Sequence, residues 1–181
     1  MSEEKLTRAA IVTGGSRGIG RAVCVALAKQ GCNVVVNYCH GAEPAEQTAA
    51  LCRAEGVQAV TVQADVSTAE GCKALFDAAA EAFGRVDVLV NNAGFGKCGD
   101  FFTSNRASQM GMVDVNCRAL TAITRLCLPY MLDDSLVINV ASIAAFAPTP
   151  RMSVYSATKA YVLALSKALH DCLLYTSDAA D

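Results

Sequence analysis

A tyrosine and a lysine stand four positions apart in the segment Tyr155-Ser156-Ala157-Thr158-Lys159. In an α-helix, residues i and i+4 lie on one face, so the phenol and the ammonium can point at one site. A nearby ammonium stabilises the phenolate form, which allows a tyrosine to act as an acid or a base near neutral pH. We therefore expect Tyr155 to exchange a proton with a substrate. The alternative interpretation is an ordinary amphipathic helix with an exposed lysine.

A serine and an asparagine accompany this pair. Ser142 follows an apolar segment in Asn139-Val140-Ala141-Ser142, where its hydroxyl can donate a hydrogen bond to a carbonyl oxygen and stabilise the alkoxide that develops on it. Asn116 falls inside an otherwise apolar helical segment, where an asparagine is mildly unfavourable. The alternatives are a turn serine and a satisfied core amide. With Tyr155 and Lys159, these residues predict a catalytic set for a carbonyl or an alcohol.

A glycine-rich turn, TGGSRGIG, follows the first apolar segment of the chain and opens a helical segment. Glycines allow the backbone to turn sharply and to approach a pyrophosphate closely. The helix amino terminus presents N–H groups and a positive dipole end to that anion. The residues predicted to bind a dinucleotide here are Thr13, Gly14, Ser16, Arg17, Gly18, Ile19 and Gly20.

The segment after the second apolar run bears on the choice of cofactor. In dinucleotide-binding domains, an acidic residue at the end of the second strand holds the ribose hydroxyls of NAD. This chain has Asn37 and Tyr38 there instead. An amide does not repel a 2′-phosphate, and Arg17 can pair with one. We therefore expect Asn37 and Tyr38 to lie at the cofactor and NADP(H) to be favoured over NAD(H).

Short apolar segments alternate with longer amphipathic ones. We expect strands over residues 9–12, 33–37, 58–63, 86–90 and 135–140. Helices are expected over 18–30, 44–55, 69–83 and 107–131, and from about residue 154 onwards. This order predicts a single α/β domain with a doubly wound, Rossmann-type parallel sheet. Ser67 is the expected cap of the third helix. The first helix is expected to bury a face made of Ile19, Ala22, Val23, Ala26 and Leu27.

Composition narrows the classes of function. Of 181 residues, 53% are hydrophobic and 18% are charged, which predicts a packed core. The net charge of −2 argues against non-specific nucleic-acid binding. No apolar run approaches the roughly 20 residues that span a bilayer, and the polar start MSEEKLTR does not resemble a signal peptide. The nine cysteines form no C-x-x-C pair, so we expect buried reduced thiols in a cytoplasmic protein and no metal site.

Five elements in this order resemble the short-chain dehydrogenase/reductase family: the turn T-G-x-x-x-G-x-G, N-N-A-G at 91–94, the helix Asn116, the strand-end Ser142 and Y-x-x-x-K. The resemblance covers residues from about 8 to 171. It implies an NAD(P)-dependent oxidoreductase in which Lys159 also holds the ribose of the cofactor, beside Tyr155. It implies that Asn116 kinks its helix and holds a water near Lys159.

The resemblance also implies further cofactor contacts and an oligomer. The pair Asp65-Val66 resembles the one that contacts the adenine, although Asp65 could instead be a turn residue that leads into a helix. In N-N-A-G, the contacts implied are those of Asn92, Ala93 and Gly94. Members of the family pair the helices that hold Asn116 and Tyr155, so a full-length homodimer or homotetramer is expected.

The substrate is open at this point. The first half of the chain resembles 3-oxoacyl carrier-protein reductases, whereas the stretch from Gly94 to Tyr161 resembles a broader branch of the family. An acyl thioester is one candidate substrate; another small alcohol, ketone, sugar or steroid is the alternative. A cofactor-binding regulator without catalysis is a third hypothesis, against which the complete set of four catalytic residues argues.

The carboxyl end of the sequence departs from the family. Residues 172–181 (CLLYTSDAAD) resemble a translated sequencing adapter, so we expect an incomplete Rossmann domain over 1–171 and a tail without function. A real polar tail is the alternative. The family continues into a sixth strand, a substrate-covering segment and a seventh strand. Without them, the 181-residue chain is expected to be poorly soluble and nearly inactive.

Overall fold

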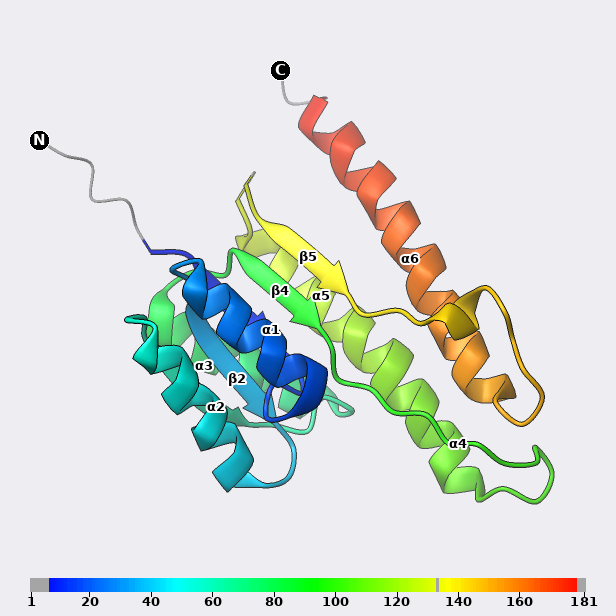
Figure 1. The fold of residues 1–181 in the computed structure, drawn as a ribbon. Coiled ribbons are helices and arrows are strands. Elements are labelled where there is room, and N and C mark those ends of the chain that lie inside the picture. Colours follow the sequence, from blue (N-terminus) through cyan, green and yellow to red (C-terminus); the bar gives the residue numbers. More distant parts are fainter. Residues whose placement is uncertain (1–6, 133, 179–181) are drawn as a thin grey trace, which may run out of the picture. The chain divides into compact units, whose positions relative to one another are not determined.

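The computed structural model describes residues 7–132 and 134–178. Residues 1–6 of the expected domain and residues 179–181 of the expected tail lie outside the described residues. Its centre is a five-stranded parallel sheet with the strand order β3-β2-β1-β4-β5 (Figure 1). The predicted α/β class with a Rossmann-like sheet is confirmed. The strands are β1 (Ala9–Val12), β2 (Asn33–Tyr38), β3 (Ala59–Gln63), β4 (Val88–Asn91) and β5 (Leu136–Asn139).

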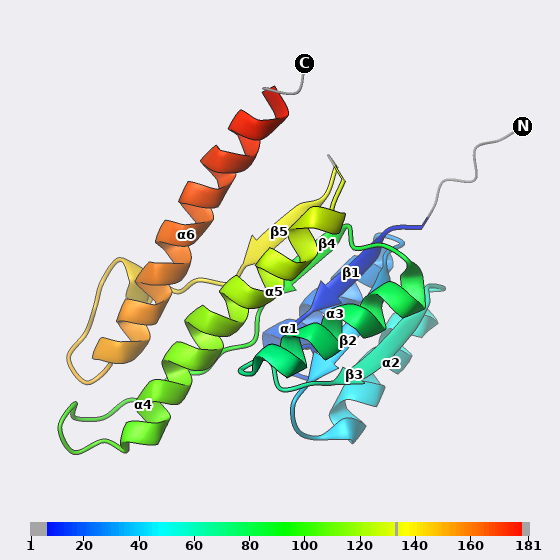
Figure 2. The same ribbon diagram turned by 180° about the vertical axis from the view of Figure 1, so that it is seen from behind.

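Helices follow the strands in alternation. Helices α1 and α2 pack against each other beside β1, β2 and β3. Helices α3 and α5 also pack against each other; α3 contacts β2 and β3, and α5 contacts β4 (Figures 1 and 2). The bounds are α1 (Gly18–Lys29), α2 (Ala42–Ala54), α3 (Ala69–Phe83), α4 (Arg106–Val113), α5 (Leu120–Cys127) and α6 (Ser153–Asp178). Short helical segments are η1 (Asp114–Ala119), η2 (Leu128–Tyr130) and η3 (Ile143–Ala145).

The chain forms two compact units. The first combines Met1–Ala93 with Ala119–Ile138 and holds nearly all of the sheet, and the second combines Gly94–Arg118 with Asn139–Asp181. The core of the first unit is built from buried aliphatic side chains of the strands and of α3 and α5, among them Ile11, Val35, Leu75, Leu89 and Ile123. Strands buried on both faces need such nearly continuous apolar runs, which is why the sequence carries them.

Three local expectations are wrong. Helix α1 buries Gly20, Cys24 and Ala28, whereas Ile19 is 66% exposed, so the buried face is rotated from the predicted one. The cap of α3 is Thr68, whose Oγ1 accepts from Gly71 N–H at 3.0 Å, and not Ser67.

The single helix expected over 107–131 is instead α4, η1, α5 and η2 in succession, and η1 is a π-helix. A π-helix bonds i to i+5 and is frequent at functional sites. Asn116 lies within η1, so the unusual geometry occurs at a residue that the sequence had singled out.

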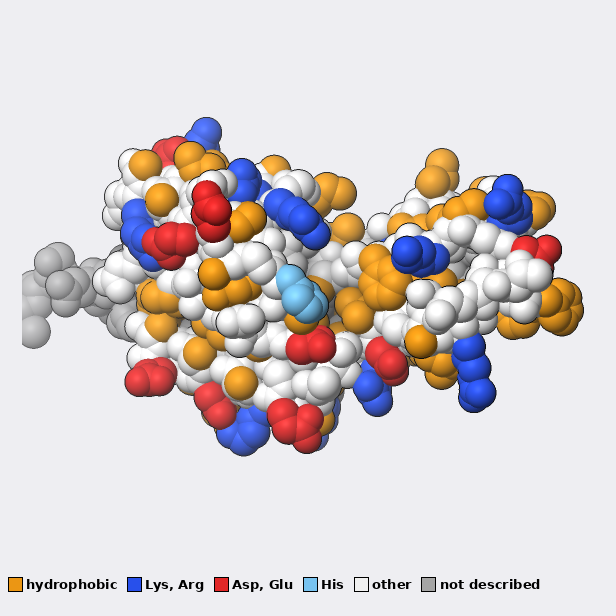
Figure 3. Space-filling view, turned by 90° about the horizontal axis from the view of Figure 1, so that it is seen from below, with side chains coloured by type: hydrophobic (Ala, Val, Ile, Leu, Met, Phe, Trp, Pro, Cys, Tyr) orange, Lys and Arg blue, Asp and Glu red, His pale blue; other side chains and the backbone are white. Residues whose placement is uncertain are grey.

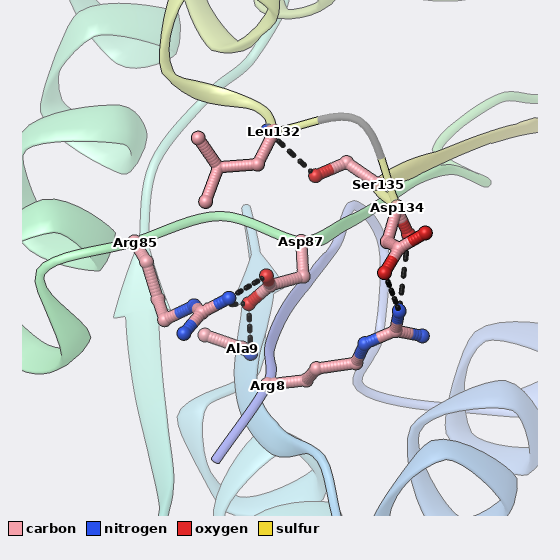
Figure 4. Close-up of polar contacts among 7 residues, drawn as sticks. All are labelled: Arg8, Ala9, Arg85, Asp87, Leu132, Asp134 and Ser135. Carbon is pink, nitrogen blue, oxygen red and sulfur yellow. Dashed lines mark hydrogen bonds and ion pairs between the residues drawn. The ribbon is translucent and has the colours of Figure 1, made fainter. Parts of the chain in front are cut away.

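A polar network stabilises the amino ends of the strands (Figure 4). Asp87 is 4% exposed, accepts from Ala9 N–H at 2.8 Å and forms an ion pair with Arg85. Arg8 donates to the carbonyl of Asp134 at 3.2 Å, and Leu132 N–H donates to Ser135 Oγ at 2.9 Å. A buried carboxylate requires such partners, so this network holds β1 beside β4.

Several large apolar side chains are exposed. In the second unit they include Phe101, Phe102, Ile143 and Phe146, and the space-filling view shows hydrophobic side chains at the surface of this part (Figure 3). None of the helices that the structure describes combines the length and the apolar character needed to cross a membrane.

Candidate active site

The glycine-rich turn connects β1 to α1 at the carboxyl end of β1. Gly14 and Gly18 have φ values of +63° and +58°, which only glycine adopts without strain. A Cβ on Gly20 would lie 2.2 Å from the Gly14 carbonyl oxygen, so the turn folds directly onto the helix. Helix α1 begins after Arg17 without a side-chain cap. Its first N–H groups and its positive end therefore suit a phosphate group.

Two residues that the sequence analysis missed hold this turn. The carbonyl oxygen of Ser16 accepts from Arg21 at 2.9 Å and from Thr48 Oγ1 at 2.9 Å. Arg21 also donates to Thr48 Oγ1 and to the Pro44 carbonyl, so α1, α2 and the turn are joined. The sequence could have indicated Thr48, because it places a hydroxyl between Ala45 and Ala49 on the apolar face of α2. In the structure this hydroxyl residue is fully buried.

The segment after β4 supports the same turn. Asn92 Nδ2 donates to the carbonyls of Thr13 and Gly14 at 3.0 and 3.1 Å. The hydroxyl of Thr13 accepts from the N–H groups of Asn92 and Ala93 at 3.0 and 2.9 Å. The side chains of Thr13 and Asn92 thus hold the turn against the end of β4, which places these predicted residues at one edge of the sheet.

Asn37 has a structural role that the sequence did not show. Its side chain is buried; its Oδ1 accepts from Gly14 N–H at 3.2 Å, and its Nδ2 donates to the carbonyls of Val62 and Ala64 at 3.3 and 3.0 Å. Asn37 therefore joins the turn to β3. These bonds do not support a contact between its amide and a ribose. Tyr38, the neighbouring residue at the end of β2, is also almost fully buried.

Asp65 follows β3 in an exposed position. Its Oδ1 accepts from Ser67 N–H at 2.9 Å, and its carbonyl accepts from Thr68 Oγ1 at 2.9 Å. Hydrogen bonds from the side chain and backbone of Ser67 hold the pKa of Asp65 below its ordinary value. The carboxylate thus stabilises the turn into α3. Val66 beside it is buried.

In the second unit, Tyr155 and Lys159 lie near the start of α6, one turn apart. The Lys159 Nζ lies 5.9 Å from the centroid of the Tyr155 ring and donates to the Val140 carbonyl at 2.6 Å. The backbone of Gly96 lies on the Tyr155 ring, because a Cβ there would be 2.9 Å from ring carbon Cδ2. The loop after Gly94 therefore covers one side of the phenol.

Ser142 lies two residues after Val140 and caps η3. Its Oγ accepts from Ala144 N–H at 3.2 Å. This bond uses a lone pair of the hydroxyl, so the proton remains available for donation to an oxygen. The Lys159 contact with Val140 holds the ammonium close to the segment that carries this serine.

Asn116 is buried and makes three hydrogen bonds within the second unit. Its Oδ1 accepts from Phe95 N–H, and its Nδ2 donates to the Phe95 carbonyl and to Thr158 Oγ1, each at 3.0 Å. A Cβ on Gly94 would lie 2.8 Å from Asn116 Oδ1. The asparagine thus connects η1 to the loop after β4 and to α6, and Gly94 leaves the space that this requires.

Burial dominates the electrostatics of the lysine. It lowers the pKa of Lys159 from its ordinary value, and the nearby thiol of Cys117 acts in the opposite direction. Burial likewise raises the pKa of the Cys117 thiol, which the ammonium of Lys159 partly offsets. Lys159 is thus a buried cation, and its charge lowers the stability of the folded protein unless a partner group compensates it.

The structure brings the predicted residues together in two groups. The turn, Thr13 and Asn92 meet at one edge of the sheet in the first unit, with Arg17 and Ile19 exposed at its surface. The predicted catalytic residues Asn116, Ser142, Tyr155 and Lys159 all belong to the second unit. Among the described residues, no group of three His, Cys, Asp or Glu side chains could hold a metal ion.

Comparison with known proteins adds relatives. A family model described as short chain dehydrogenase matches residues 8–177. The 3-oxoacyl-[acyl-carrier-protein] reductase of Staphylococcus aureus is 36% identical over 166 residues, which are 91% of this chain and 68% of that protein.

Two solved structures are similar over most of the chain. A short-chain dehydrogenase/reductase from Serratia marcescens has a TM-score of 0.88 and 30% identity, covering 93% of this chain and 69% of that one. A dehydrogenase/reductase from Sinorhizobium meliloti has a TM-score of 0.88 and 34% identity, covering 92% and 66%. The chain thus spans about two thirds of the length of these relatives, and it belongs to the short-chain dehydrogenase/reductase family.

Proposed function

We propose that the protein is an NADP(H)-dependent oxidoreductase that reduces a carbonyl group to an alcohol. The observation that carries the proposal is the arrangement in the second unit. There the ammonium of Lys159 lies beside the Tyr155 ring, and Asn116 bonds the loop that also covers this ring. Buried ionisable and polar groups lower the stability of a protein, and they are typical of functional sites.

The roles of the residues follow from their chemistry. In the reduction, the Tyr155 phenol donates its proton to the carbonyl oxygen, and Ser142 donates a hydrogen bond to the same oxygen. Lys159 stabilises the phenolate that remains. Asn116 keeps the loop at Phe95 in place over the phenol.

Membership of the family implies an NAD(P) cofactor, which supplies the hydride when bound. The residues present fit its pyrophosphate, because the turn has two glycines with positive φ and leads into an uncapped helix. Arg17 is the exposed cation of this turn, and we propose that it pairs with a 2′-phosphate.

The cofactor preference is tested by Arg17→Ala, with Lys29→Ala at the other end of α1 as the matched control. The dissociation constants of NADPH and NADH are measured by cofactor fluorescence. Arg17→Ala is expected to weaken NADPH binding about tenfold or more while NADH changes little. An equal loss for both cofactors, or no loss, would contradict the preference for NADP(H).

A 3-oxoacyl thioester is the proposed substrate. The support is the relatives, which include several 3-oxoacyl-[acyl-carrier-protein] reductases at 35–36% identity. The exposed apolar residues Ile143 and Phe146, which follow Ser142, also suit a substrate with an apolar chain. A small alcohol or ketone of another kind is the second candidate, since the solved relatives are described only as dehydrogenases or reductases.

An oligomer and a cytoplasmic location belong to the same proposal. Met110 and Val113 of α4 are exposed and available for an interface, whereas Leu120 of α5 is buried in the core. Five of the nine cysteines are buried, whereas Cys98 and Cys172 are exposed, so the expected burial of the thiols holds for part of the set.

The proposed function is tested with the protein translated from the complete reading frame of its gene. Oxidation of NADPH is followed at varied concentrations of an acetoacetyl thioester and of unrelated ketones. Saturable turnover of the thioester is expected. Turnover of ketones alone would move the substrate to the second candidate, and NADPH binding without any turnover would favour a cofactor-binding regulator.

A further inference from the structure

Thr158 lies in α6, between Tyr155 and Lys159, and makes two directed hydrogen bonds. Its Oγ1 donates to the carbonyl of Tyr155 at 2.7 Å and accepts from Asn116 Nδ2 at 3.0 Å. The residue is 3% exposed. Both the proton and a lone pair of the hydroxyl are therefore used inside the protein, at the backbone of the residue that is proposed to transfer a proton.

The direction of each bond is fixed by the chemistry of its groups. Phe95 N–H can only donate, so Asn116 must present its oxygen there. The Asn116 amide nitrogen then faces Thr158 and donates to it, which leaves the Thr158 proton for the Tyr155 carbonyl. The bonds form one directed chain from Phe95 through Asn116 and Thr158 to Tyr155.

This series of hydrogen bonds connects three separate segments of the second unit: the loop after Gly94, the π-helix η1 and the start of α6. A second contact supports it, because Cys117 Sγ lies 3.9 Å from the carbonyl of Thr158. A Thr or Ser hydroxyl often donates to the carbonyl one turn back in a helix, and here the Thr158 oxygen also accepts from Asn116 Nδ2. The first turn of a helix is otherwise the part that frays most easily.

We propose that Thr158 is a positioning residue that fixes Tyr155 relative to Asn116 and to the loop at Phe95. The inference rests on the proposed function, in which Tyr155 is the proton donor. Proton transfer requires the donor within hydrogen-bond reach of the substrate oxygen, and a displacement of about 1 Å can cost about a hundredfold in rate.

The chain offers a matched control on the same helix. Ser166 Oγ donates to the Val162 carbonyl at 2.7 Å and accepts from Asn139 Nδ2 at 2.9 Å, so it has the same pair of partners in kind. It lies about 12 Å further along the helix axis, at about 1.5 Å per residue. Ser166→Ala therefore removes an equivalent hydroxyl away from Tyr155.

The experiment compares Thr158→Val, Thr158→Ala, Thr158→Ser and Ser166→Ala with the wild type, all in the protein from the complete reading frame. We expect kcat to fall about tenfold to a hundredfold in Thr158→Val and Thr158→Ala, while the KM for NADPH changes less than about twofold. Thr158→Ser keeps the hydroxyl and is expected to restore most of kcat. Wild-type kcat in Thr158→Val or Thr158→Ala, or a Thr158→Ser variant as impaired as these two, would overturn the inference.

Amide hydrogen exchange of residues 94–97 gives a readout without turnover. Loss of the Thr158 hydroxyl is expected to accelerate exchange at the Phe95 amide about tenfold, whereas Ser166→Ala leaves it unchanged. Equal exchange in all variants would overturn the positioning role even if kcat falls. If the wild type reduces no carbonyl, the proposed function fails, and faster exchange in the Thr158 variants would still support the connection from Thr158 to Phe95.

Discussion

Asn116 and Phe95 are joined by two reciprocal hydrogen bonds, in which the side-chain amide of Asn116 pairs with both the N–H and the carbonyl of Phe95 at 3.0 Å. The pairing resembles that of two adjacent strands, with a side chain in place of one backbone. It makes the π-helix η1 a support for the loop that begins at Gly94.

Asn116→Ala is expected to abolish these bonds and to expose the loop. The variant leaves the part-buried N–H and carbonyl of Phe95 without these partners, each at a cost of about 0.5–1.5 kcal/mol. We expect a fall in kcat of at least about a hundredfold together with a clear loss of stability. Asn105→Ala is the control, because Asn105 Oδ1 caps α4 through Ser108 N–H and should cost only about 1 kcal/mol with little effect on kcat. Similar kinetics in the two variants would contradict the account.

Gly96→Ala tests the contact between the loop and the phenol. The added Cβ would lie 2.9–3.1 Å from three atoms of the Tyr155 ring, so the ring or the loop must move. We expect kcat to fall about tenfold or more, with a small change in melting temperature. Gly111→Ala is the matched control, since its Cβ would be no closer than 3.4 Å to Phe95 and alanine favours the helix by about 1 kcal/mol. Unchanged kcat in Gly96→Ala would show that the loop does not confine Tyr155.

Lys159→Met tests the cost of the buried ammonium. Because burial lowers the pKa of Lys159, the folded protein binds fewer protons than the unfolded chain between that lowered value and 10.5. The stability of the wild type therefore rises with pH across this window. Below the window, the buried charge of Lys159 lowers the free energy of unfolding by its full amount.

Lys159→Met lacks this dependence, so the wild type should gain stability relative to the variant as pH rises. The free energy of unfolding of both proteins is measured by denaturant titration at about pH 7 and about pH 10. A difference between the two proteins that does not change over this range would contradict a depressed pKa at Lys159.

Asp87→Asn tests the network at the amino ends of the strands. The change keeps the shape of the side chain but removes the charge that pairs with Arg85 and weakens the bond from Ala9 N–H. We expect a loss of about 3 kcal/mol in the free energy of unfolding. The exposed pair of Lys73 and Asp77, at 2.6 Å, gives the control, because Asp77→Asn should cost less than about 1 kcal/mol. Equal losses would show that burial of Asp87 adds nothing to this pair.

The sheet could be predicted from the sequence because its strands are mostly apolar and alternate with longer amphipathic segments. The predicted bounds of β1 and α3 agree with the structure, and the other elements shift by only a few residues, except that the helix expected over 107–131 is divided into α4, η1, α5 and η2. The π-helix could not be predicted, because its single extra residue per turn leaves no composition signal. The buried face of α1 was misjudged because Ile19, although apolar, is exposed at the end of the glycine-rich turn.

The sequence indicated candidate site residues by type and position, and it did not indicate the hydrogen bonds that connect them. Tyr155, Lys159, Ser142 and Asn116 were recognised from spacing, yet their partners Thr158 and Phe95 were not. For Asn37 the sequence predicts a ribose contact, and the structure adds hydrogen bonds to the carbonyls of Val62 and Ala64, in and just beyond β3. Such bonds depend on which strands become neighbours, which no local pattern encodes.

The most direct test of the account is Tyr155→Phe in the protein from the complete reading frame. The rate of NADPH oxidation with an acetoacetyl thioester and the dissociation constant of NADPH are measured on the same sample. Loss of the phenolic proton is expected to reduce kcat by about a hundredfold to ten-thousandfold while NADPH binding stays within about threefold. A variant that keeps the wild-type rate would contradict the central claim that Tyr155 donates the proton.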